Sequence, residues 1–218
     1  MSKKTINKNS GHTMMISGGI DSVALAYHVR SSKMDVISAI FFDYGQEAAG
    51  QELHAARAAT LQTEIPFESV NISGLKYLFY GLLEGPYHPL MAECHGCGDL
   101  LAPWGIAATY TVLRGANRML VGIVKDDLAR IPGLKDYIEH FNNATSSLHG
   151  IDFKVVTPFI DIDKSEIIKN APKEANNLAS TWCCFGAGPL HCGICEGCKR
   201  RKNAFIAATI TDGAKFSS

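Results

Sequence analysis

The pattern of apolar and polar positions along the chain has two forms, short apolar runs and longer segments with helical periodicity. Short apolar runs such as 35–43 and 118–124 are typical of buried strands. Between them lie longer segments with helical spacing, such as 47–62, which is rich in alanine and carries its charges on one face. The expected strands are 12–17, 35–43, 65–72, 118–124 and 153–158, and the expected helices are 21–30, 47–62, 100–116, 134–148 and 163–170.

This alternation of strands and helical segments predicts βαβ units. Such units give an α/β fold, here a Rossmann-like, doubly wound parallel sheet. In sheets of this kind ligands bind beyond the carboxyl ends of the strands, so the turn after the first strand is the expected ligand site. Two local signals mark helix ends: Gly115 suits a left-handed cap, and Asp163 with Glu166 has the spacing of a capping box.

Composition and charge narrow the choice of partner. The chain has 218 residues, 46% of them hydrophobic, which suffices for one α/β domain with a sizeable core. Lys plus Arg and Asp plus Glu both number 21, so no overall field attracts nucleic acid or a membrane surface. No apolar run approaches the roughly 20 residues needed to span a bilayer, and residues 1–11 are polar without a signal-peptide core behind them. We therefore expect a cytoplasmic protein that binds a small molecule.

The turn after the first strand reads Ser-Gly-Gly-Ile-Asp-Ser, residues 17–22. Glycines let the backbone approach a ligand, N–H groups at a helix start attract anions, and serine hydroxyls can donate to phosphate oxygens. The sequence contains neither Gly-x-x-x-x-Gly-Lys-Ser/Thr nor Gly-x-Gly-x-x-Gly. This 17–22 loop therefore predicts a less common phosphate site, the alternative being an ordinary glycine-rich turn whose Asp21 and Ser22 cap the helix. The candidate binding residues are Ser17, Gly18, Gly19, Ile20, Asp21 and Ser22.

The pattern Ser-Gly-Gly-x-Asp-Ser resembles the pyrophosphate loop, or PP-loop, of ATP pyrophosphatases. These enzymes split ATP into AMP and pyrophosphate in order to adenylate a substrate. The resemblance implies that the 17–22 loop binds ATP and that Asp21 lies near Mg²⁺ and pyrophosphate. Ser17, Asp21 and Ser22 are then catalytic candidates.

Five of the seven cysteines lie between residues 183 and 198. In a chain without an export signal, such crowding suits metal binding better than disulfides. Two x₂ spacings and an earlier cysteine across a Gly/Pro loop fit a structural, tetrahedral zinc site; the alternatives are an iron–sulfur cluster, His191 in place of one thiolate, or cysteines without a metal. Cys183 is adjacent to a ligand and is not expected to share the metal. The predicted zinc ligands are Cys184, Cys192, Cys195 and Cys198.

Four segments, in order, resemble the 7-cyano-7-deazaguanine synthase family of queuosine biosynthesis. They are the 17–22 loop, Phe-Asp-Tyr-Gly-Gln-Glu at 42–47, Thr-Pro-Phe-Ile-Asp-Ile-Asp-Lys-Ser-Glu-Ile-Ile at 157–168, and Thr-Trp at 181–182 followed by the cysteine motif. The resemblance implies an ATP-dependent carbon–nitrogen ligase that adenylates the carboxylate of 7-carboxy-7-deazaguanine and releases AMP and pyrophosphate. Ammonia then gives the amide, and a second ATP dehydrates the amide to the nitrile.

The resemblance also implies an organisation and further site residues. A PP-loop domain would span 1–180 and a zinc knuckle with the last helix 181–218, in a homodimer that uses ATP, Mg²⁺ and Zn²⁺. Lys164 would reach the phosphates, unless it is a solvent-exposed lysine in the first turn of its helix. The residues expected to line the adenine or substrate side are Tyr44, Gly45 and Gln46, which would otherwise form a bare turn.

One segment departs from the family pattern. Where the family has Val-Pro-x-Arg-Asn before a helix, this chain has Cys94, Cys97 and Asp99, so a positive group has been replaced by a negative one. We expect these three residues at a rebuilt substrate pocket. The two cysteines could also be plain loop residues, a nucleophile, a redox pair or a second metal site with His95.

Three functions are consistent with these patterns. The first is nitrile formation with free ammonia. The second is a paralogue that attaches the deazaguanine to a protein or peptide amine and stops at the amide. The third is a sulfur-inserting tRNA enzyme, which the zero net charge disfavours, because the basic cluster at 199–202 is expected to be a solvated helix face.

Overall fold

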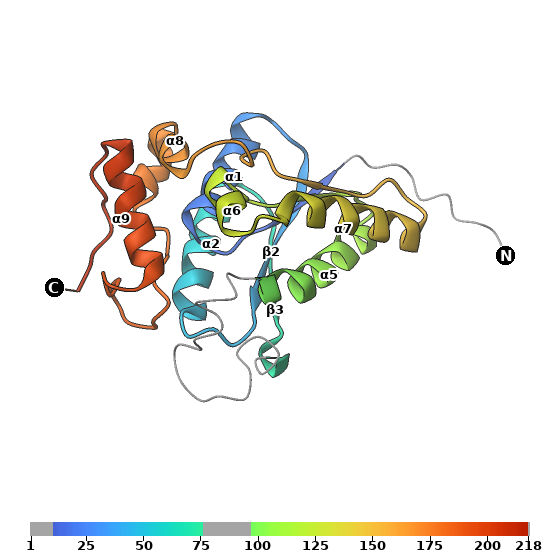
Figure 1. The fold of residues 1–218 in the computed structure, drawn as a ribbon, viewed down its shortest axis with the longest axis horizontal. Helices are drawn as coiled ribbons and strands as arrows, with labels where there is room; N and C mark the ends of the chain where they lie inside the picture. Colours follow the sequence, from blue (N-terminus) through green and yellow to red (C-terminus); the bar gives the residue numbers. More distant parts are fainter. Residues whose placement is uncertain (1–10, 76–96, 218) are drawn as a thin grey trace.

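Five parallel strands form the centre of the fold (Figure 1). The computed structural model describes residues 11–75 and 97–217, and within these residues the strand order is β3-β2-β1-β4-β5. The first strand is therefore central, with β2 on one side and β4 on the other. The strands are β1 (His12–Met15), β2 (Val36–Asp43), β3 (Phe67–Asn71), β4 (Arg118–Leu120) and β5 (Lys154–Val156).

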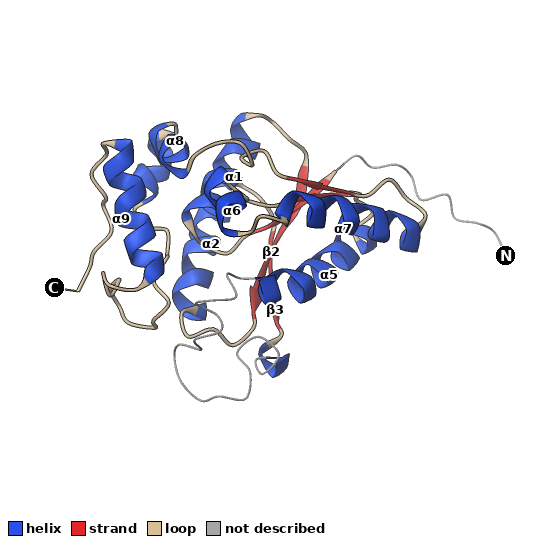
Figure 2. Cartoon of the chain, viewed as in Figure 1, coloured by secondary structure: helices blue, strands red, loops and turns tan. Residues whose placement is uncertain are grey.

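Helices connect the strands and cover both faces of the sheet (Figure 2). Helices α1 and α2 share one apolar core with the sheet, while α5 and α7 contribute to a second core on the other face. The α-helices are α1 (Ile20–Ser31), α2 (Ala49–Thr63), α5 (Cys97–Leu113), α6 (Lys125–Arg130), α7 (Leu134–His149), α8 (Lys164–Lys169) and α9 (Glu196–Ala208), and the short 3₁₀ helices are η1 (Ser73–Leu75) and η2 (Lys173–Leu178).

Strand β2 shows why the sheet is buried on both sides. Successive side chains of a strand point to opposite faces. Phe41 packs in the core that contains α1, whereas its neighbours Ile40 and Phe42 pack with Trp104 of α5 in the other. A strand enclosed in this way reads as a continuous apolar run, which is what made 35–43 recognisable.

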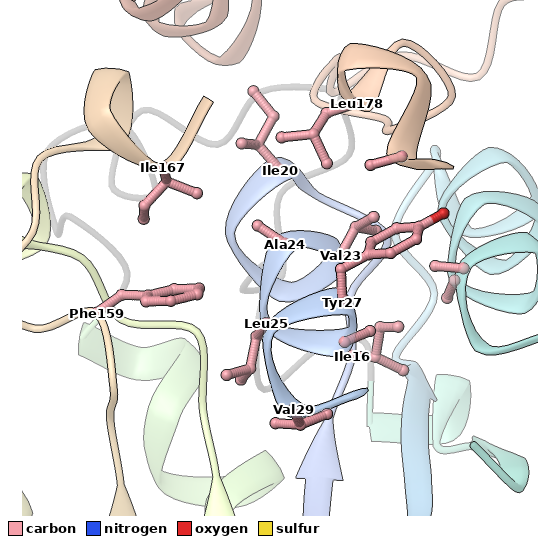
Figure 3. Close-up of a cluster of buried hydrophobic side chains, with 14 of the residues drawn as sticks. Ile16, Ile20, Val23, Ala24, Leu25, Tyr27, Val29, Phe159, Ile167 and Leu178 are labelled. Carbon is pink, nitrogen blue, oxygen red and sulfur yellow. The ribbon is translucent and has the colours of Figure 1, made fainter. Parts of the chain in front are cut away.

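Helix α1 is enclosed by other elements over most of its surface (Figure 3). Its buried residues lie all round the helix, and Phe159, Ile167 and Leu178 pack with them from segments late in the chain. A helix that is buried on nearly all sides is fixed by contacts with its neighbours rather than by water on a polar face. The start of α1, which follows the 17–22 loop, is therefore held in place by packing.

The prediction of an α/β fold with a parallel sheet is confirmed, and most elements lie where the sequence indicates. Gly115 follows α5 with a φ of +78°, as a left-handed cap requires. The expected strand 118–124 is wrong in its second half, because β4 ends at Leu120. After it the Val121 amide still donates to the Val156 carbonyl at 3.0 Å, and Gly122 lies against the first turn of α1.

The expected capping box at the start of α8 is wrong. Asp163 is the N-cap residue, but its side chain makes no capping hydrogen bond. Its carboxylate instead lies 3.1 Å from Nζ of Lys125, at the start of α6. Because α6 is a short helix that the sequence patterns did not indicate, this competing cation could not be foreseen.

Two expectations concern the whole chain. None of the helices in the described residues has the length and apolar character needed to cross a membrane. The division into 1–180 and 181–218 stays a prediction.

Candidate active site

The 17–22 loop joins the end of β1 to the start of α1, at the carboxyl edge of the sheet. The Oγ atoms of Ser17 and Ser22 are 3.2 Å apart, and Ser22 Oγ also accepts a hydrogen bond from the Ser17 amide at 3.2 Å. Gly19 is the N-cap of α1 and has no side chain to cap it, so Asp21 and Ser22 do not cap the helix as in an ordinary turn. A helix start without a side-chain cap favours an anion, as a phosphate loop requires.

Two glycines let other segments approach this loop closely. Gly18 has a φ of +79°, and a Cβ at this position would lie 2.3 Å from the backbone oxygen of Glu52 in α2. At Gly122 a Cβ would lie 2.9 Å from the backbone carbon of Asp21. Backbone from two directions therefore fixes the loop, and both contacts need a residue without a side chain.

Asp21 and Lys164 form an ion pair beside the loop. Lys164 Nζ lies 2.9 Å from Asp21 Oδ2, and the two side chains are only 17% and 20% exposed. Burial raises the pKa of Asp21, with the ammonium opposing that rise. Burial disfavours the charged ammonium too, but the carboxylate holds the pKa of Lys164 above its ordinary value. The alternative of a solvent-exposed Lys164 is wrong, because α8 packs against α1 and brings the lysine to the loop.

The other carboxylate oxygen of Asp21, Oδ1, is buried, and no described residue gives it a hydrogen bond. Such an acceptor is costly without a partner. Mg²⁺ in phosphate-binding sites is held by one or two carboxylates together with the phosphates. Asp21 therefore fits the part of a Mg²⁺ ligand.

A cavity of about 260 Å³ lies next to the loop, at the carboxyl ends of β1 and β2. Trp104 of α5 and the segment after β4 complete its walls. Three predicted residues do not line it: Gly18, Ile20 and Gly45. Ile20 instead packs in the core around α1. The predicted site residues that do line it are Ser17, Gly19, Asp21, Ser22, Tyr44 and Gln46.

Gln46 shapes the turn at residues 44–46. Its side chain is buried, and its Oε1 accepts a hydrogen bond from the Tyr44 amide at 2.9 Å. Its Nε2 donates to the Phe42 carbonyl at 3.2 Å and to Glu52 Oε2 at 2.9 Å. Because every polar atom of this amide is engaged, the segment is more than a bare turn: it is tied to β2 and to α2.

Glu52 is a cavity residue that the sequence patterns missed. Burial raises the pKa of its carboxyl group; the hydrogen bond from Gln46 opposes this rise and the nearby charge of Asp43 adds to it. One signal could have found it. Glu52 precedes the buried Ala55 and Ala56 by three and four positions, so it lies on the buried face of α2 rather than on the charged one.

The four predicted zinc ligands come together between residue 184 and the start of α9. Their Sγ atoms lie within 4.8 Å of one another, and those of Cys192 and Cys198 are 3.9 Å apart. Tetrahedral zinc with Zn–S bonds of about 2.3 Å separates its sulfur ligands by about 3.8 Å. Burial opposes ionisation of Cys192, but the amides of Ile194 and Cys195 and the neighbouring thiols lower its pKa to about 6. The donor set therefore fits a closed, structural metal site.

Cys183 and His191 lie beside this cluster. Cys183 Sγ is 3.5 Å from His191 Nδ1, and with Cys198 these two residues make a second group that could hold a metal. The His191 ring stacks on Trp182 with ring centroids 4.2 Å apart. Trp182 also links the two sites, because its amide donates to the Gly18 carbonyl at 2.9 Å and its Nε1 donates to the Cys184 carbonyl at 2.8 Å.

The expectation of a solvated basic face at 199–202 is wrong for Arg201. This side chain is fully buried, and its guanidinium makes two 2.8 Å contacts with the Asp212 carboxylate. It also donates to Thr181 Oγ1 at 2.6 Å and to the Leu178 carbonyl at 3.1 Å. A buried charge needs such complete pairing. Arg201 therefore joins α9 to the segment that precedes the cysteines.

The predicted substrate-pocket residues cannot be placed in the same way. Cys94 lies outside the described residues. Helix α5 begins at Cys97 and includes Asp99, but the side chains of these two residues also lie outside what the structure describes. Their expected role stays a prediction.

Similarity to known proteins is extensive. The family model described as Queuosine biosynthesis protein QueC matches residues 12–84 and 102–209. The 7-cyano-7-deazaguanine synthase of Methanobrevibacter smithii is 27% identical over 100% of this chain and 99% of its own length. That of Caldicellulosiruptor bescii is 28% identical over 93% of this chain and 96% of its own. The family suggested by the sequence motifs is thus confirmed.

The fold has relatives of another kind. A structure of the U34-tRNA thiolase NcsA from Methanococcus maripaludis with its [4Fe-4S] cluster superposes with a TM-score of 0.54 and 19% identity, covering 95% of this chain and 72% of that one. This likeness concerns the fold alone. Because the family model matches most of its length, the chain belongs to the QueC family of queuosine biosynthesis proteins.

Proposed function

We propose that the protein is an ATP-dependent ligase that adenylates the carboxylate of 7-carboxy-7-deazaguanine, with release of AMP and pyrophosphate. The observation that supports this most directly is the 17–22 loop beside a cavity, with the Asp21–Lys164 pair at its edge. Membership of the QueC family points to the same substrate class.

Each residue of the site has a different proposed contact with ATP. The serine hydroxyls and the start of α1 bind the pyrophosphate, and Lys164 offsets its negative charge. Asp21 would hold Mg²⁺ through its unpaired oxygen. When bound, that ion neutralises charge on the phosphate oxygens and orients them. Each of these groups is fixed before ATP arrives, so little reorganisation is needed in the transition state.

Adenylation solves a chemical problem of the substrate. A carboxylate has no good leaving group, whereas in an acyl-adenylate AMP departs when an amine attacks. Ammonia as the amine gives the amide, and a second ATP activates the amide oxygen so that it leaves and the nitrile forms. The free energy of ATP cleavage thus drives a C–N bond formation that is unfavourable in water.

We propose that Zn²⁺ is held by the four clustered cysteines and stabilises the segment around them. With four thiolates no position is left open to water, so its contribution is structural. The proposal includes a homodimer, which light scattering would test against the chain mass of 23.6 kDa.

A product assay tests the proposed reaction. Protein, ATP, Mg²⁺, 7-carboxy-7-deazaguanine and ammonium should yield AMP, pyrophosphate and a base with the mass of the nitrile. Asp21→Asn should lower AMP formation at least about 100-fold, whereas the matched variant Asp136→Asn, an exposed residue of α7, should not. ADP and phosphate as products would contradict the assigned bond cleavage. A deazaguanine linked by an amide to protein, or AMP release only with tRNA, would replace the proposal by the second or third sequence-based function.

A further inference from the structure

Glu52 lines the cavity, and its side chain is not among the groups proposed to bind the phosphates. Its carboxylate comes from α2, and one of its oxygens, Oε2, accepts the hydrogen bond from Gln46 Nε2 at 2.9 Å. The same Nε2 donates its second proton to the Phe42 carbonyl at 3.2 Å. The amide orientation of Gln46 is therefore fixed, and it fixes Glu52 in turn.

The other oxygen of Glu52, Oε1, accepts no hydrogen bond from the described residues, and it is not among the fully buried oxygens. Among the described residues that line the cavity, none is Lys, Arg or His. The walls around it include Met15, Ile40 and Phe42, whose side chains have no N–H or O–H to donate. Without a ligand only water in the cavity can donate to this oxygen, and a ligand that brings its own N–H donor can replace that water.

The chemistry of the missing donor can be stated. An ionised carboxylate accepts hydrogen bonds and donates none. A guanine-type base presents a ring N–H and an exocyclic NH₂ side by side on one edge, while adenine presents an NH₂ beside a ring nitrogen that is itself an acceptor and would be repelled. The cavity volume of about 260 Å³ is just below the roughly 300–1,000 Å³ of pockets for drug-sized ligands, so it suits a small bicyclic base.

We propose that Glu52 Oε1 accepts a hydrogen bond from the N–H edge of the guanine-type base of the substrate, and that Glu52 thereby selects this base. The inference rests on the proposed function for the identity of the substrate. It assigns to Glu52 a specificity role separate from the phosphate chemistry of Asp21 and Lys164.

The substitution Glu52→Gln changes the hydrogen-bonding character of this side chain while keeping its size. The glutamine carbonyl can still accept the hydrogen bond from Gln46, and the backbone oxygen against Gly18 does not change. The glutamine NH₂ would then replace Oε1 and would turn an acceptor toward the ligand into a donor. Glu47→Gln is the matched control, because Glu47 is an exposed acid five positions earlier in the chain.

The experiment measures binding of two bases by calorimetry: 7-carboxy-7-deazaguanine and its analogue without the 2-amino group. The wild-type protein should prefer the amino-bearing acid by at least about 10-fold. Glu52→Gln should weaken binding of that acid by at least about 10-fold and reduce the preference to below about threefold, with ATP affinity unchanged. Glu47→Gln should behave as the wild type.

Several results would overturn the inference. Equal binding of both bases by the wild type would do so, and this arm needs no variant to fold. Equal affinity of wild type and Glu52→Gln for the amino-bearing acid would also do so. Parallel losses for both bases and ATP would show a structural role, and a loss for ATP alone would assign Glu52 to adenine. If the wild type binds ATP but neither base, the proposed function fails first, and this inference fails with it.

Discussion

The 17–22 loop and the cysteine cluster are both expected ligand sites, but they keep their shapes in different ways. Around the loop, backbone from α2 and from the segment after β4 presses on Gly18 and on the first turn of α1, which is itself deeply packed. Around the cysteines, apolar side chains face water: Ile194 is 77% exposed and Phe185 44%. A site shaped by packing persists without its ligand, whereas a site without its own core depends on the bonds to its metal.

The largest expected effect is loss of the metal. Cys195→Ser removes one of four thiolates, and structural zinc contributes on the order of 10 kcal/mol to folding such a segment. We expect loss of bound zinc and fast amide exchange from residue 183 to the first turn of α9, with the later part of α9, which packs in the core around α1, still protected. Metal analysis and hydrogen exchange measure both. Ser180→Ala, an exposed residue outside the cysteine groups, is the control, and a Cys195→Ser protein that keeps its zinc and its protection would refute the dependence.

The second effect concerns the buried guanidinium. Arg201→Met leaves the Asp212 carboxylate without its partner, and breaking a buried pair costs about 3–5 kcal/mol. Urea denaturation should show this loss. Lys199→Met changes an exposed cation of the same helix and should stay within about 0.5 kcal/mol of the wild type. If the two variants are equally stable, Arg201 does not join α9 to the rest of the fold.

The third effect tests the packing of the loop. Gly18→Ala places a Cβ 2.3 Å from the Glu52 backbone oxygen at a φ of +79°, so we expect a loss of about 1–3 kcal/mol and of ATP binding. Gly50→Ala, in α2, has no atom within 4 Å of its Cβ and should instead add about 0.5–1 kcal/mol. Thermal unfolding distinguishes the two signs. A Gly18→Ala protein as stable as the wild type would mean that the loop is not held by this contact.

The smallest effect is a pH dependence of stability that arises from Glu52. Burial raises its pKa in the folded protein above the ordinary 4.5. Between the unfolded and folded pKa values the native state binds the extra proton, so stability falls as pH rises through this window. Relative to Glu52→Gln, the wild type should therefore be more stable near pH 4 than near pH 7. A melting-temperature difference that is constant with pH, or that grows in the opposite direction, would contradict the burial of this charge.

The two sites also differ in how much of them could be predicted from sequence. The 17–22 loop and the four cysteines are local patterns whose spacing states the chemistry directly. The Asp21–Lys164 pair depends on how α8 packs against α1, which spacing alone does not encode; the family resemblance suggested only that each residue lies near the phosphates. Tertiary packing decided this contact.

Two charged residues show a pattern that sequence analysis can use. Glu52 precedes the buried Ala55 and Ala56 by three and four positions, and Arg201 precedes the buried Ala204 and Phe205 by the same steps. Helical spacing at 47–62 places the charges on one face without singling out Glu52, and the cluster at 199–202 predicts a solvated Arg201. A charged residue in line with the apolar face of a helix is a candidate for a buried pair or a ligand contact.

Trp182 donates one hydrogen bond to the Gly18 carbonyl and another to the Cys184 carbonyl, so a single side chain and its amide touch both sites. If occupation of the cysteines shifts Trp182, thermodynamic linkage requires the coupling to run equally in both directions. Nucleotide would then retard extraction of the metal by a chelator, by the same factor by which the metal tightens nucleotide binding. Metal starvation would therefore weaken nucleotide binding together with the unfolding of the segment around the cysteines.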